Sequence, residues 1–134
     1  MKDILRNKER EELIHDLKRH DHDWAAERLR EARDDRGYTT ITMAEILTVS
    51  RKVIAQLLCG HTHGDCREYY PSRSLVTDVC TLLRLSVTQK YQMLCVFCPR
   101  DVASDYVSLK RLPLREVDAI LWDAGIDPDK LRRV

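Results

Sequence analysis

The feature that most constrains this chain is the segment 40–59, TITMAEILTVSRKVIAQLLC, in which two short amphipathic stretches meet. Apolar side chains recur at helical spacing in each stretch, and only Thr48 and Val49 separate the two. Ser50, at the start of the second stretch, is a residue type that favours helix N-termini. The segment therefore predicts two helices joined by a tight turn, each with one buried face.

Particular side chains in this segment suit a helix pair of the kind that binds DNA. Ala44 is small where the two helices would cross, and Val49 is apolar where the bend would meet the core. Ser50, Arg51 and Lys52 form a polar first turn of the second helix. A helix that enters the major groove needs such an exposed, hydrogen-bonding N-terminal turn. We therefore expect the segment to be a DNA-reading helix-turn-helix.

The sequence before this segment predicts two more helices. Residues 3–20 carry an apolar stripe among charged side chains, which is typical of a short amphipathic helix. The next helix is expected to have Asp23 as its cap and to end at Gly37. Thr40 or Thr42 is the expected cap of the first helix of the segment. The side chains expected to face inward are Leu13, Ile14, Leu17, Trp24, Ala25, Leu29, Ala32, Met43, Ala44, Ile46 and Leu47.

The sequence after the segment predicts two helices that begin at Ser72 or Ser74 and at Ser86 or Thr88. Gly60 is expected to end the helix before them. The stretch HTHGDCREYYPSR that follows Gly60 is rich in turn formers and is expected to be an exposed loop. The inward-facing side chains expected in this part are Val53, Ile54, Leu57, Leu58, Leu75, Val76, Val79, Leu82, Leu83, Val87, Tyr91 and Leu94.

The tail is expected to be helical again after an interruption at Pro99. Pro113 and Gly125 stand where the start and the end of a helix favour these residue types. A short turn is expected at 127–128. The expected inward face of the tail helix is Leu114, Val117, Leu121 and Ala124.

Composition agrees with an all-α fold of about one domain. The chain has 134 residues, with four Gly, four Pro and a single Phe, and such a composition favours long helices over sheets. Its 23 basic and 22 acidic side chains give a net charge of +1. The sum does not indicate nucleic acid, so a DNA-binding face would have to arise from where the charges lie.

Two stretches carry a resemblance to a known family. LREARDDRGYTTITMAEILTVSR and PSRSLVTDVCTLLRLSVTQKYQML are similar to the first three and the last two helices of XRE-type, lambda-repressor-like helix-turn-helix regulators. The resemblance covers about residues 24–94. Thr48 departs from it, because the family normally has Gly there, and the segment around 64–68 is longer than usual.

The resemblance implies a compact five-helix DNA-binding domain at 23–94, with helical extensions at 1–22 and 95–134. It also implies a repressor, such as a phage immunity repressor, that binds a palindromic double-stranded operator as a homodimer in the bacterial cytoplasm or nucleoid. A monomer that reads an asymmetric site stays open as the alternative. The tail 95–134 is then a surface for the second copy or for another protein partner.

Candidate DNA-contacting residues follow from the expected helix pair. Thr40 and Thr42, at the start of its first helix, suit phosphate contacts through hydroxyl and backbone N–H groups. Arg pairs well with guanine, Gln with adenine, and Ala with a thymine methyl group. The expected base contacts are Ser50, Arg51, Lys52, Ala55 and Gln56, and the expected phosphate contacts are Thr40, Thr42, His61, His63 and Arg73.

The histidines and cysteines allow a metal site but do not favour one. Four candidate zinc ligands fall within eight residues, Cys59, His61, His63 and Cys66, and a CxxC spans 95–98. Their spacing is not a standard zinc pairing. Free cysteine is also common in helical cores, and the CxxC lacks the βαβ context of redox proteins. We expect no metal, no cofactor and no disulfide.

Enzymatic activity is not expected, because the chain has no Gly-rich phosphate loop, nucleophile elbow or HExxH motif. No window approaches the ~18 apolar residues of a membrane span, and the polar N-terminus is not typical of a signal peptide. Two alternatives remain open beside a stand-alone regulator. One is the antitoxin of a toxin–antitoxin pair, and the other is a helical adaptor that does not bind DNA.

Overall fold

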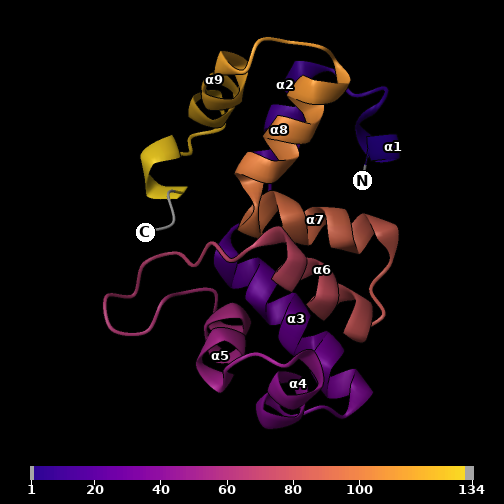
Figure 1. Ribbon diagram of the computed structural model, residues 1–134, viewed down its shortest axis with the longest axis vertical. Helices are drawn as coiled ribbons and strands as arrows, with labels where there is room; N and C mark the ends of the chain where they lie inside the picture. The colour runs from indigo at the N-terminus through magenta and orange to yellow at the C-terminus, as the bar shows by residue number, and fades with distance from the viewer. Residues whose placement is uncertain (1, 132–134) are drawn as a thin grey trace.

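The computed structural model describes residues 2–131 and confirms that this part of the chain is all-helical. It contains no strand, only an isolated antiparallel bridge between His61 and Glu68. Figure 1 shows the helices and the two ends of the chain. The elements are α1 (Lys2–Leu5), α2 (Arg10–Lys18), α3 (His22–Arg36), α4 (Thr40–Leu47), α5 (Arg51–Cys59), α6 (Arg73–Leu82), α7 (Val87–Phe97), α8 (Pro99–Leu109), α9 (Arg115–Asp123) and the 3-10 turn η1 (Pro128–Leu131).

Three serines cap helices as their sequence context predicts. Ser50, Ser72 and Ser86 each accept a hydrogen bond from the backbone N–H three residues later, at 3.2, 3.2 and 3.1 Å. Gln89 completes a capping box by accepting from the N–H of Ser86 at 2.8 Å. Gly37 ends α3 in the left-handed conformation, with φ +71°. These local signals are therefore sufficient to place four helix ends.

Two predicted caps are wrong, because each helix begins earlier than expected. Asp21, not Asp23, accepts from the N–H of Trp24 at 2.8 Å and starts α3. Thr39, not Thr40 or Thr42, accepts from the N–H of Thr42 at 3.0 Å and starts α4. A capping side chain accepts from the N–H two or three residues later, and Asp21 and Thr39 each do so three residues later.

The N-terminal stretch forms two helices where a single one was expected. The chain breaks after Leu5 and becomes helical again at Arg10. Leu5 and Leu13 are both fully buried, but α1 packs against α8 whereas α2 packs against α7 and α9. One straight helix would not bring both leucines to these neighbours, and the break allows both to be buried.

The helices form two tiers (Figure 1). In the lower tier α3 packs on α5, α4 packs on α5, and α6 packs on α7. The upper tier joins the two ends of the chain, since α1 packs on α8 and α2 packs on α9. Helix α7 contacts α2, α3 and α8 and so connects the tiers. One continuous hydrophobic core runs through both tiers and includes Leu13, Leu57, Leu94 and Leu121.

The tail differs from its expected pattern at particular positions. Pro99 does not only interrupt a helix, because it is the first residue of α8, which the sequence did not predict. Val117, Leu121 and Ala124 are buried as expected, while Leu114 is 85% exposed because it precedes α9. Two other predicted core residues, Ile46 and Val87, are also exposed. No helix within residues 2–131 has both the length and the apolar character that crossing a membrane requires.

Candidate nucleic-acid interface

Helices α4 and α5 are joined by a tight turn with a left-handed residue at its centre. Thr48 has φ +57° and ψ +47°. Its N–H donates to the carbonyl of Glu45 at 3.3 Å, and the N–H of Val49 donates to the carbonyl of Ala44 at 3.0 Å. This pair of hydrogen bonds is the Schellman pattern, which satisfies the last carbonyls of α4 and reverses the chain.

The side chains predicted to lie where α4 and α5 cross are buried. Ala44 is 4% exposed, and Ile54 and Leu57 are completely buried. Val49, in the turn, is partly buried and packs against the hydrophobic core. Helices α4 and α3 both pack against α5. Helix α5 is therefore held by two helices, and its first turn remains in solvent.

The first turn of α5 presents polar and basic groups to solvent. Ser50, Arg51 and Lys52 are all exposed, and the turn contains no acidic residue. Neither Arg51 nor Lys52 forms an ion pair with any carboxylate of residues 2–131. Two cations without internal partners, beside the positive end of a helix dipole, suit an anionic partner. Ala55 lies one turn further along α5 and is partly buried.

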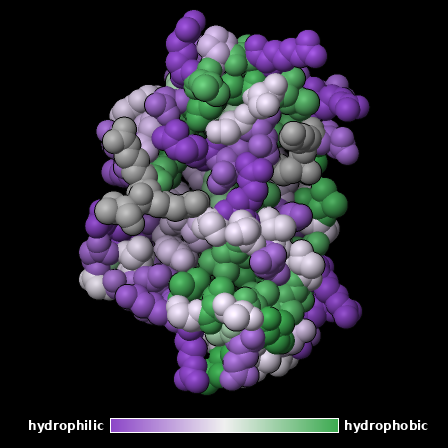
Figure 2. All heavy atoms as spheres, viewed as in Figure 1, coloured by the Kyte–Doolittle hydropathy of each residue, from purple (hydrophilic) through white to green (hydrophobic). Residues whose placement is uncertain are grey.

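The neighbouring surface of α4 is partly apolar and carries no basic side chain. Ile41 and Ile46 are 45% and 51% exposed, and Glu45 is exposed between them. Figure 2 shows apolar and polar side chains mixed over this lower part of the molecule. Electrostatic attraction at this face therefore depends mainly on Arg51 and Lys52.

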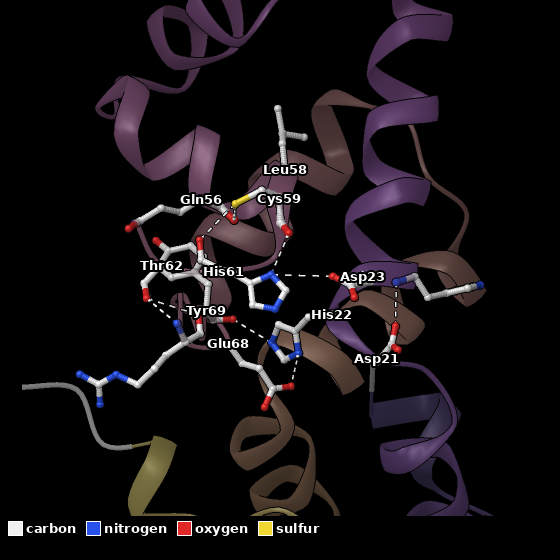
Figure 3. Close-up of polar contacts among 12 residues, drawn as sticks. Asp21, His22, Asp23, Gln56, Leu58, Cys59, His61, Thr62, Glu68 and Tyr69 are labelled. Carbon is white, nitrogen blue, oxygen red and sulfur yellow. Dashed lines mark hydrogen bonds and ion pairs between the residues drawn. The ribbon is translucent and has the colours of Figure 1, made fainter. Parts of the chain in front are cut away.

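Gln56, which was predicted to read a base, lies on the buried side of α5. Its side chain is 9% exposed, and its Oε1 accepts from the backbone N–H of His63 at 3.0 Å. Figure 3 shows it among the residues at the C-terminal end of α5. The carboxamide fastens the following loop to the helix.

Some of the threonine groups that were predicted to bind phosphate already form hydrogen bonds within the protein. The N–H of Thr42 donates to Oγ1 of Thr39, and the hydroxyls of these two residues lie 2.9 Å apart. Thr40 and Thr42 are both partly buried. Thr39 therefore engages both the hydroxyl and the N–H of Thr42, and neither is free in this structure to bind phosphate.

His61 and His63 lie at the opposite end of α5 from Ser50. A nine-residue helix is roughly 13 Å long, so these histidines and the first turn of α5 are about that far apart along the helix axis. The Nδ1 of His61 lies 3.2 Å from the carbonyl of Cys59 and 3.8 Å from Oδ1 of Asp23. His63 is exposed.

Arg73 is turned toward α8. Its Nη2 donates to Oδ1 of Asp105 and to the carbonyl of Asp101, both at 3.1 Å. Asp105 is 14% exposed, so the pair is partly removed from solvent. The structure therefore gives Arg73 a role in joining α6 to α8 and does not place it with Arg51 and Lys52.

A buried histidine that the sequence did not predict holds the loop after α5. His22 is 4% exposed, its Nε2 lies 2.9 Å from the carbonyl of Tyr69, and its Nδ1 lies 3.0 Å from Oε2 of Glu68 (Figure 3). Its ring is edge-on to Tyr70 and Phe97, at 4.8 and 5.3 Å between centroids. Burial lowers the pKa of His22, and the nearby Glu68 carboxylate partly opposes this shift.

A signal for His22 was present in the sequence. It precedes Ala25, Ala26 and Leu29 at spacings of three, four and seven residues, which places all four on one helical face. A run such as HDHD is usually a solvated surface, and that interpretation is wrong at His22 because the helix already begins there.

The cysteines and histidines do not converge on a metal. Within residues 2–131, no three or more His, Cys, Asp or Glu side chains are arranged to hold an ion. Cys95 and Cys98 are buried, and burial raises the pKa of the Cys95 thiol to about 12. Cys59 and Cys66 are exposed free thiols.

Compared with protein-family models, with curated proteins and with solved structures, the chain gives no match.

Proposed function

We propose that this protein is a sequence-specific double-stranded DNA-binding regulator that reads its operator with the first turn of α5. One observation carries the proposal: Ser50, Arg51 and Lys52 are exposed at the start of α5, next to a tight Schellman turn, and neither cation pairs with a carboxylate of residues 2–131. The resemblance of residues 24–94 to XRE-type regulators supports the same function and favours a repressor.

The proposed reading set is smaller than the sequence predicted. Arg51 and Lys52 donate hydrogen bonds to acceptor atoms of guanine or to phosphate oxygens. Ser50 donates its hydroxyl hydrogen, because its oxygen already accepts from the N–H of Val53. Ala55 suits contact with a thymine methyl group. Gln56 and Arg73 are not in the set, since both are engaged within the protein.

A selection from random duplexes, performed with the full chain, tests this proposal. We expect an enriched motif, and we expect the affinity for it to fall steeply with salt, because phosphate contacts release counterions. Arg51→Ala is expected to cost roughly 1–3 kcal/mol on the selected duplex and less on scrambled DNA.

Arg115→Ala is the matched control. Arg115 is an exposed arginine at the start of α9, in the upper tier, and its loss removes the same charge away from α5. Equal loss of affinity in Arg51→Ala and Arg115→Ala would show that only the net charge of the protein matters, and it would reject base reading by Arg51. A selection without any enriched motif and binding without salt dependence would reject DNA reading altogether.

A protein-binding function is the second candidate, and exposed apolar residues favour it. On the upper tier Trp122 is 60% exposed and Leu114 is 85% exposed, and on α4 Ile41 and Ile46 are exposed as well. An antitoxin would hold its toxin through the tail, and an adaptor would use α4. Co-purification of a defined small protein, which is lost in Trp122→Ser, supports the antitoxin.

The proposed regulator acts as a homodimer, as the family resemblance implies. Most of the tail stripe packs inside the chain, since Val117, Leu121 and Ala124 are buried. A second copy would therefore have to contact the exposed Leu114 and Trp122. Light scattering with and without the selected duplex decides this point, and a symmetric motif together with a two-copy complex is the expected result.

A further inference from the structure

A hollow of about 310 Å³ lies between the N-terminal segment and α7, away from the α4–α5 pair. Ile4 of α1 lines it, as do Val87 and Tyr91 of α7. The charged lining residues are Lys8 in the loop before α2, Asp16 within α2 and Arg19 at its end. Its volume lies at the lower end of the range for small-molecule sites, roughly 300–1,000 Å³. No feature of the proposed DNA interface uses this hollow.

In one part of the lining, three polar side chains are connected through Asp16. Oδ2 of Asp16 lies 2.9 Å from Nζ of Lys8 and accepts from the hydroxyl of Tyr91 at 2.9 Å. The side chains of Lys8 and Asp16 are 18% and 16% exposed. Their charges neutralise each other, and the hydrogen bonds fix the positions of three elements around the hollow.

Arg19 supplies a cation that the lining does not neutralise. It is exposed at the C-cap of α2, and none of the carboxylates of residues 2–131 forms an ion pair with it. His20, also in the lining, stacks on Trp24 at 3.5 Å, and burial lowers its pKa, so it adds no charge at neutral pH. The residues that line the hollow therefore carry one more positive than negative charge, and Glu12, outside the lining, also pairs with Lys8 at 3.7 Å.

The other part of the lining is apolar and incompletely covered. Val87 is 66% exposed although it stands at the start of a helix that is otherwise largely buried. Ile4 is partly buried, and Tyr91, which also lines the hollow, is buried. A ligand that covers Val87 gains the free energy of removing its apolar surface from water.

We propose that this hollow binds a small organic anion, a monocarboxylate with a short aliphatic or aromatic body. The carboxylate lies against Arg19, and the body lies against Ile4, Val87 and Tyr91. Because the ligand contacts α1, α2 and α7, it ties the N-terminal segment to the helix that connects the two tiers. Binding at this hollow does not depend on whether the protein binds DNA.

Hexanoate, with the neutral hexan-1-ol as its comparison, is the probe for the test. The full chain, labelled with nitrogen-15, is titrated with each compound and followed by NMR. We expect saturable shifts with hexanoate at Arg19, at Val87 and at Gln92, which also lines the hollow, and much weaker binding of hexan-1-ol. Arg19→Gln should weaken hexanoate binding by roughly tenfold, since it removes a charge-assisted hydrogen bond.

Two variants complete the design. Arg115→Gln makes the same change in the exposed arginine of α9 and should leave hexanoate binding unchanged. Val87→Ser, at an exposed position, should weaken hexanoate and hexan-1-ol alike by removing part of the apolar wall. Equal affinity for hexanoate and hexan-1-ol, equal loss in the two arginine variants, or shifts that do not saturate would each overturn the proposal.

Discussion

The buried imidazole of His22 holds its Nδ1 3.0 Å from Oε2 of Glu68 and so connects the start of α3 with the loop after α5. The other ring nitrogen faces the carbonyl of Tyr69, so both nitrogens lie opposite acceptors. A carbonyl can only accept, hence Nε2 carries a hydrogen. A second proton, on Nδ1, would charge the ring, which burial disfavours and the Glu68 carboxylate favours.

The first prediction concerns how stability depends on pH. Burial lowers the pKa of His22 below its ordinary value of 6.5, so the unfolded chain binds this proton more readily than the folded one. The stability linked to a neutral His22 is complete above pH 6.5 and is lost as the pH falls from there toward the folded pKa. The stability advantage of the wild type over His22→Gln, measured by urea unfolding, should therefore shrink over that window.

Glu68→Gln provides the control for this assignment. Glu68 raises the pKa of His22, so its replacement by the neutral amide should lower that pKa further in an NMR titration. If the advantage of the wild type over His22→Gln instead grows as the pH falls, then pairing of the charged ring with Glu68 outweighs burial. The pKa of His22 would in that case be raised by folding and not lowered.

The second prediction concerns Gly60, at the end of α5. Its φ is +83°, and a Cβ added to it would lie 2.9 Å from the carbonyl oxygen of His22. Gly37 also has a left-handed φ, of +71°, but an added Cβ there meets no atom within 4 Å. Both alanine variants carry the conformational cost of roughly 1–2 kcal/mol. Gly60→Ala should lose about 1–3 kcal/mol more than Gly37→Ala in urea unfolding, because α3 and α5 must move apart.

Much of the lower tier is predictable from sequence because its signals are local. Ser50, Ser72 and Ser86 cap helices through hydrogen bonds that span only three residues, and Gly37 ends α3 through its own backbone. Such contacts depend on neighbours in the chain and not on the tertiary fold. The all-helical class follows from the same kind of signal.

The parts that sequence reasoning missed depend on contacts between distant segments. His22 is buried because Tyr69, 47 residues later, faces its ring nitrogen. Gln56 turns inward because the N–H of His63 needs an acceptor, and Arg73 turns toward α8 because Asp105 lies there. Periodicity indicates which face of a helix is apolar, but it does not show which polar side chain finds an internal partner.

The third prediction concerns the strained turn between α4 and α5. Thr48 is β-branched and adopts φ +57°, where glycine has no steric penalty. Thr48→Gly should therefore raise the free energy of unfolding by roughly 1 kcal/mol. Thr88→Gly, in the first turn of α7, is the comparison and should lower it by roughly 0.3 kcal/mol. A loss of stability in Thr48→Gly would contradict the left-handed conformation of the turn.

The fourth prediction separates folding from DNA binding at Arg73. Its ion pair with Asp105 joins α6 to α8, and Arg73→Ala leaves that partly buried carboxylate without its cation. We expect a loss of about 1 kcal/mol in urea unfolding, since the arginine itself is 41% exposed and solvent screens the pair.

Asp105→Asn breaks the same pair from the other side and should lose a similar amount of stability. Both variants should bind the selected duplex as the wild type does, because Arg73 is directed toward α8 and not toward the partner of α5. If Arg73→Ala weakens DNA binding and flattens its salt dependence while Asp105→Asn does not, then Arg73 leaves Asp105 and contacts phosphate in the complex. The DNA-binding face would in that case extend from α5 to the start of α6.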